Sequence, residues 1–110
     1  MKPQVLEIIN RIPVGRVAYY GQVSDVLAME FEIYVRAQVV GWVLSGMKAA
    51  EYDLCPWQRV VSKTGFVSTL KLGPKGMLQL ELIQREGIEI VDDVVDMKRF
   101  GIATEDLLSK

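Results

Sequence analysis

The chain has 110 residues, half of them hydrophobic, and a formal net charge of −1. This length allows one domain over residues 1–110 and hardly two. With one cysteine and no histidine, an internal disulfide is excluded, and no metal site, cofactor or histidine-based catalytic dyad is expected. No apolar run approaches the roughly 20 residues that cross a bilayer, and no signal-peptide pattern is present. We therefore expect a cytoplasmic protein without a membrane partner, in which any DNA contact depends on a local basic surface.

The first predicted helix begins at Pro3, because proline suits the first turn of a helix, where its missing N–H has no partner. Pro13 cannot continue the pattern, so the helix is predicted to stop before it. Between the two prolines, apolar residues recur at helical spacing: Val5, Leu6, Ile8, Ile9 and Ile12.

The next segments predict a helix-turn-helix. A short β-prone stretch over 17–20 precedes Gly21, where a second helix starts, and residues 29–34 are predicted to connect it to a third. The third helix is predicted over 34–47, because its apolar residues form two adjoining i, i+4 stripes. Two helices with a short connection are typical of a helix-turn-helix.

A small wing is predicted after a polar loop at 48–53. Two short apolar runs, at 60–61 and 66–67, flank a glycine-containing turn at 63–65, which favours a β-hairpin.

The C-terminal part predicts one more long helix, opened by Pro74 and stopped at Gly87. Residues 88–91 are predicted to be extended, and 92–110 to form a tail in which Thr104 caps a short helix. The elements together predict a mainly α fold with a small β-hairpin or wing, of the winged helix-turn-helix type.

The run Pro56-Trp57-Gln58-Arg59-Val60 resembles the active-site box Pro-Cys-His-Arg-Val of the O6-alkylguanine-DNA alkyltransferases. In that family the cysteine takes an alkyl group from a damaged guanine. The resemblance spans roughly residues 3–91 and implies the fold of the alkyltransferase C-terminal domain. Further signals follow in the family's order: Ile12-Pro13-Val14-Gly15-Arg16-Val17-Ala18-Tyr19-Tyr20-Gly21, Val40-Gly41, Arg59-Val60-Val61 through Gly65, and Leu82 to Gly87.

Trp57 stands where the family has its cysteine, and Gln58 replaces the histidine that activates it. An indole cannot form a thiolate, so we predict no catalytic residue and no enzyme of this kind. With tryptophan in place of the acceptor cysteine, the chain resembles the alkyltransferase-like proteins, a subfamily that lacks this cysteine. That resemblance implies a monomer that binds and flips O6-alkylguanine in double-stranded DNA and hands the lesion to the damage sensor of nucleotide excision repair.

The resemblance also assigns roles around the recognition helix. Tyr20 matches a tyrosine that crowds the phosphate and drives base rotation, and Gly41 lets the helix approach the backbone closely. The family's intercalating arginine lies three residues before that glycine. Gln38 is therefore the first candidate for this role, and Arg36, about 200° around a helix from it, is the second.

Trp42 and Ser45 fall on the helix face of Gln38, at i+4 and i+7. Trp42 suits either an apolar wedge between bases or a buried aromatic. Because tryptophan is mostly core material, burial is the prediction.

For Trp57, a structural tryptophan competes with a flat pocket wall against which the O6-alkyl group lies. Arg59 is predicted to be structural first and a phosphate ligand second. Glu86 matches a glutamate that ties the closing helix to the recognition region. The remaining predicted pocket and loop residues are Leu44, Gln58, Val60, Ser68 and Lys71, the last two in the loop expected to close over the flipped base.

Cys55 precedes Pro56 and lies two positions from the nucleophile site, so we predict a free buried thiol. Two alternatives remain open. One is an enzyme that transfers alkyl groups to Cys55. The other is a winged-helix module that binds ordinary DNA or a protein without lesion preference, which Gln38, Gln58 and the acidic balance favour.

Overall fold

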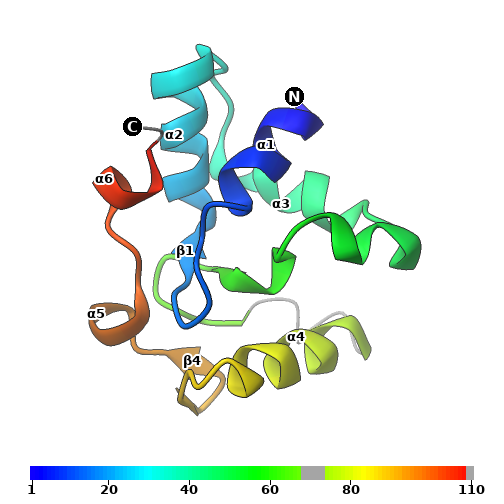
Figure 1. Cartoon of the computed structure of the whole chain (residues 1–110), viewed down its shortest axis with the longest axis vertical. Coiled ribbons are helices and arrows are strands. Elements are labelled where there is room, and N and C mark those ends of the chain that lie inside the picture. The colour runs from blue at the N-terminus through cyan, green and yellow to red at the C-terminus, as the bar shows by residue number, and fades with distance from the viewer. Residues whose placement is uncertain (68–73, 109–110) are drawn as a thin grey trace.

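The computed structural model describes residues 1–67 and 74–108, and within them the chain is mostly helical (Figure 1). Very short strands join the helices. In chain order the elements are α1 (Lys2–Ile9), β1 (Ala18–Tyr19), α2 (Tyr20–Phe31), α3 (Ala37–Ser45), the 3-10 helices η1 (Ala49–Leu54) and η2 (Trp57–Arg59), β2 (Val60–Val61), α4 (Pro74–Arg85), β3 (Ile90–Val91), β4 (Val94–Val95), α5 (Met97–Phe100) and α6 (Thr104–Leu107).

The first three helices gather in one half of the molecule, with α2 packed against both α1 and α3, whereas α4 and the β3–β4 pair lie in the other half (Figure 1). The box at 56–60 lies between the halves as η2 followed by β2, and η2 packs against α4. The box is thereby held between the helix-turn-helix and α4.

Strand β2 pairs in parallel with β1 and separates two hydrophobic clusters. Successive strand side chains point to opposite faces, so Val60 enters the larger cluster and Val61 the smaller. The larger cluster contains Val5, Ile8, Ile9, Ile12, Ala18, Val23, Val26, Leu27, Val40, Leu44, Met47, Cys55, Trp57, Val60 and Leu107; the smaller contains Val17, Val61, Val67, Ile83, Ile88 and Val95.

The helix-turn-helix prediction is confirmed, with shifted boundaries. Helix α2 continues to Phe31, inside the predicted connection at 29–34, because Phe31 packs against the larger cluster. It ends where Glu32 adopts a left-handed conformation at φ 55°. Helix α3 begins only at Ala37, since the preceding Arg36 is extended. The first helix likewise ends at Ile9, earlier than predicted, although Ile12 is still buried.

The predicted hairpin between 60–61 and 66–67 is wrong in its pairing. Strand β2 pairs with β1, and the turn is closed by a bond from the Ser62 N–H to the Phe66 carbonyl at 3.1 Å. Phe66 bridges Val94 instead. The hairpin of this fold is β3–β4, where Asp92 and Asp93 both have positive φ, as a type I′ turn requires.

The segment predicted to be a tail is part of the fold. The Ile102 N–H donates to the Val17 carbonyl at 2.8 Å, and the Gln22 amide donates to the Ile102 carbonyl at 2.7 Å. Leu107 is completely buried in the larger cluster. Thr104 is the first residue of α6 and not its cap, which is Ala103.

No helix in the described ranges combines the length and apolar character needed to cross a membrane. Within the same ranges, no three potential metal-binding side chains from Cys, Asp or Glu gather into a site.

Candidate nucleic-acid interface

Helix α3 and its flanks form a stretch without acidic residues in a chain of net charge −1. No Asp or Glu occurs between Glu32 and Glu51, whereas Arg36 precedes the helix and Lys48 follows it. Glu51 is itself ion-paired with Lys2, which also lowers the pKa of the Glu51 carboxyl. This stretch therefore carries only positive formal charge, which suits contact with a phosphate backbone.

One small pocket collects five of the predicted residues: Tyr20, Gly41, Leu44, Ser45 and Trp57. They come from the start of α2, from α3 and from η2, so only the tertiary fold brings them together. The described residues leave about 20 Å³ there, room for roughly one water molecule. A flipped base can enter only if this pocket widens.

Trp57 is a core residue and a pocket wall at once. Its side chain is 4% exposed, and its ring centroid lies 5.1 Å from that of Tyr52, with the planes tilted by 42°. The two roles predicted as competitors are therefore compatible, because one edge of a buried indole can still line a pocket.

Two further pocket residues, Lys75 and Gln79, were not predicted. Both lie on α4, about 15 and 19 residues beyond the end of the box, and no local motif marks them. The Lys75 ammonium donates to the Leu44 carbonyl at 3.0 Å and lies 5.4 Å from the ring centroids of both Tyr52 and Trp57. Burial lowers the pKa of Lys75, because its charged form loses water contacts.

Gln79 is almost completely buried and holds the box by its backbone. Its amide donates to the Gln58 carbonyl at 3.1 Å and to the Val60 carbonyl at 2.9 Å. A buried amide with two acceptors fixes the chain around Trp57, since leaving those carbonyls unpaired would be costly.

The burial predicted for Trp42 is wrong: this side chain is 61% exposed. Helix α3 instead buries Val40 and Leu44, which leaves Trp42 on the outer face with Gln38. Ser45 is also exposed, and its hydroxyl donates to the Trp42 carbonyl at 3.1 Å. The second predicted role of Trp42, an apolar wedge, is compatible with this exposure.

Gln38 and Arg36 are both exposed, but only Gln38 lies on the helix. Arg36 is the residue before α3, with extended φ and ψ of −75° and 156°. Because Arg36 is not helical, the angle of about 200° expected between it and Gln38 on a helix does not apply. Which of the two residues intercalates stays a prediction.

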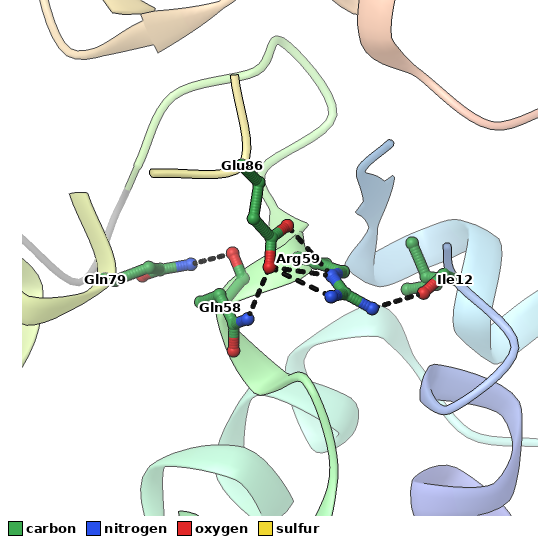
Figure 2. A network of polar contacts seen from close by, with 5 residues as sticks. All are labelled: Ile12, Gln58, Arg59, Gln79 and Glu86. Atoms are coloured by element: carbon green, nitrogen blue, oxygen red, sulfur yellow. Dashed lines mark hydrogen bonds and ion pairs between the residues drawn. The ribbon is translucent and has the colours of Figure 1, made fainter. Parts of the chain in front are cut away.

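Arg59 and Glu86 form the center of a polar network that joins three segments (Figure 2). The Arg59 Nε donates to both Glu86 oxygens at 2.9 and 3.1 Å, and its Nη1 donates to the Ile12 carbonyl at 2.6 Å. The Gln58 amide adds a bond to Glu86 at 3.0 Å. The structural role predicted for Arg59 is confirmed. Glu86 follows α4, and its carboxylate ties this end of the closing helix to the box through Gln58 and Arg59.

A larger hollow of about 500 Å³ also touches Trp57, but it does not collect the predicted site. Among the predicted DNA-binding residues that the structure describes, only Trp57 and Gln58 line it. Asp53 is the single charged residue of its described lining, and the Asp53 carboxylate would repel a phosphate. We therefore place the site at the smaller pocket beside α3.

The model of the DNA-binding domain of 6-O-methylguanine DNA methyltransferase matches residues 1–88, which is most of the chain. The chain belongs to this family. A comparison with curated proteins gives no match.

Two solved structures show the same fold as this family member. One is S. pombe Atl1 in complex with damaged DNA containing O6-carboxymethylguanine, with a TM-score of 0.77, 20% identity and coverage of 93% of this chain and 94% of that one. The other is S. pombe ATL in complex with DNA, with a TM-score of 0.66, 20% identity and coverage of 99% and 94%. The alkyltransferase-like fold predicted from the sequence is confirmed.

Cys55 does not have the surroundings of a methyltransferase nucleophile in this family member. It is buried in the larger cluster, and burial raises the pKa of its thiol. The reactive thiolate is therefore disfavoured at neutral pH. The prediction of a free buried thiol is confirmed.

Three predicted residues remain: Val60, Ser68 and Lys71. Val60 is completely buried in the core, so its side chain does not reach the surface of the pocket. Ser68 and Lys71 lie outside the described residues.

Proposed function

We propose that this protein recognises DNA damage without repairing it: it binds O6-alkylguanine in duplex DNA, flips the base into the pocket beside α3 and marks it for nucleotide excision repair. The main support for this proposal is the position of Trp57. It occupies the cysteine position of the box and forms one wall of the pocket that Tyr20 and α3 complete.

The arrangement of the pocket supports base flipping. A base altered at O6 is hidden in the stack, and rotating it out costs a few kcal/mol. Tyr20 begins α2 at the pocket, and the Cβ that Gly41 lacks would lie 3.9 Å from the Tyr20 ring. Because Gly41 has no side chain, α3 can come close to the DNA backbone next to Tyr20. The exposed face with Gln38 and Trp42 can then occupy the space that the base leaves.

No cysteine is among the described residues that line the pocket, which supports a reader and not an enzyme that accepts alkyl groups on a thiol. Trp57 offers only a flat apolar surface, which suits alkyl groups of different sizes and excludes water. Cys55 is near in sequence but does not line this pocket. In agreement with this proposal, Atl1 of S. pombe, whose fold this chain shares, was solved with damaged DNA that contains O6-carboxymethylguanine.

The decisive experiment compares the full chain's affinity for two duplexes that differ only in O6-methylguanine or guanine at one position. We expect a preference of about tenfold or more for the lesion, equivalent to about 1.4 kcal/mol, and a decline of both affinities with salt. Equal affinities would contradict lesion reading and support the winged-helix alternative. Intact-mass measurement after incubation should show no methyl gain; a methylated Cys55 would contradict the non-enzymatic assignment.

A further inference from the structure

We propose that Lys75 makes the pocket selective for O6 substituents that carry a negative charge, such as a carboxymethyl group, over neutral substituents of the same size. This inference rests on the proposed function and adds to it the chemical class of the preferred lesion. It concerns a residue that the box and its surrounding motifs do not include.

The position of Lys75 relative to Trp57 is the first argument. Its Nζ lies 5.4 Å from the Trp57 ring centroid, and both residues line the pocket beside α3. Trp57 occupies the position at which the family box places its alkyl acceptor. A substituent on O6 that reaches this wall therefore comes within reach of the ammonium group.

The free hydrogen-bonding capacity of Lys75 is the second argument. An ammonium group has three N–H donors and no acceptor. One donor is used by the Leu44 carbonyl at 3.0 Å, and the rings of Tyr52 and Trp57 face the group without offering a directional oxygen acceptor. Within the described residues two donors thus remain for a carboxylate, and such charge-assisted bonds are about twice as strong as neutral ones.

The charge balance around Lys75 is the third argument. None of the ion pairs in the described ranges includes Lys75, so no carboxylate of these ranges neutralises it. Burial also lowers the pKa of this lysine, because its charged form loses water contacts. An anionic substituent would supply the missing charge, whereas a methyl or amide group would not.

The experiment uses one duplex sequence with four bases at one position: guanine, O6-methylguanine, O6-carboxymethylguanine and O6-(carbamoylmethyl)guanine. The last two substituents match in size and differ in charge. We expect the carboxymethyl duplex to bind roughly tenfold more tightly than the carbamoylmethyl duplex, by charge-assisted bonding to the partly buried ammonium group of Lys75.

Lys75→Met removes the charge and the donors but keeps an unbranched, slightly shorter side chain, and should reduce this ratio to about one. Lys75→Arg should retain most of the ratio, since both donor and charge persist. Lys48→Met is the matched control: it removes an exposed lysine beyond α3 that does not line the pocket, and should leave the ratio unchanged. Thermal melting of each variant shows that it is folded.

Equal binding of the carboxymethyl and carbamoylmethyl duplexes by the native protein would overturn the inference. So would a ratio that survives in Lys75→Met, or an equal loss of affinity for all four duplexes, which would make Lys75 a phosphate contact. In these cases a retained preference for O6-methylguanine over guanine leaves the proposed function standing. If no modified duplex exceeds guanine, both the proposed function and this inference fail.

Discussion

The indole of Trp57 is surrounded by a tyrosine ring at 5.1 Å and an ammonium group at 5.4 Å. Both contacts stabilise an aromatic ring at this position, by offset packing and by cation–π attraction. The change to tryptophan thus does more than remove a nucleophile. The surrounding residues hold the Trp57 ring in a position where it forms a pocket wall. Truncating it to alanine would cost about 3–5 kcal/mol of stability, so it is a poor residue for isolating a binding effect.

Trp42 is the better probe of DNA contact, because it is exposed and its loss should change stability by no more than about 0.5 kcal/mol. If it stacks in the space left by the flipped base, Trp42→Ala should weaken lesion binding by about 1–3 kcal/mol. Fluorescence anisotropy with an O6-methylguanine duplex measures the affinity, and thermal melting the stability.

Val91→Ala is the control for Trp42→Ala, since it removes another exposed apolar side chain, at the β3–β4 hairpin and away from the pocket. It should leave the affinity unchanged. An unaltered affinity of Trp42→Ala would show that the outer face of α3 does not stack on DNA.

The turn at 63–65 contacts strand β4, and this contact matters for the fold. Gly65 has φ 92°, and its carbonyl accepts the Val95 N–H at 2.8 Å. A Cβ on Gly65 would lie 2.0 Å from the Val95 carbonyl oxygen. The turn after the box is therefore docked on strand β4, and this contact connects the box to the hairpin.

Gly65→Ala should lower the free energy of unfolding by more than the about 1–3 kcal/mol of left-handed strain alone, because the new methyl also displaces β4. Gly87→Ala is a matched control: Gly87 has φ 84°, but a Cβ there meets no atom within 4 Å. That variant should show the strain alone. Urea denaturation measures both, and an equal loss in the two variants would contradict the docking of the turn.

At the scale of the whole molecule, the C-terminal segment closes the structure. Residues 101–102 bridge to Val17 beside β1, and α6 places Leu107 in the larger cluster with residues of α1 and α2. The Arg59–Glu86 pair similarly joins the box, the turn at Ile12 and the end of α4. The pocket beside α3 therefore depends on contacts between segments far apart in the chain.

Leu107→Ala should lower the free energy of unfolding by about 2–5 kcal/mol, because it leaves a cavity in the larger cluster. That is a large share of the roughly 5–15 kcal/mol typical of a whole domain. Leu54→Ala, at an exposed position, should cost no more than about 0.5 kcal/mol. Urea denaturation compares them, and an insignificant effect of Leu107→Ala would show that α6 is dispensable.

Features with local causes were predictable. Proline at the start of α1 and α4, and the positive φ of Gly87 after α4, depend on the backbone of a few neighbouring residues. The end of α2 was not, because Phe31 extends it by packing against distant residues. The strand that pairs with β2 could not be predicted either, since two valines suit a hairpin as well as a parallel pair with β1.

The sequence by itself determined that a tryptophan occupies the cysteine position of the box, with the helices and the family pattern around it. Only the tertiary structure decided that Trp42 faces outward, that Glu86 holds Arg59, and that Lys75 joins Trp57 in one pocket. The physical reason is the distance along the chain between the residues that interact. A helix start or a missing thiol is a property of adjacent atoms, whereas exposure and charge pairing depend on which distant segments meet.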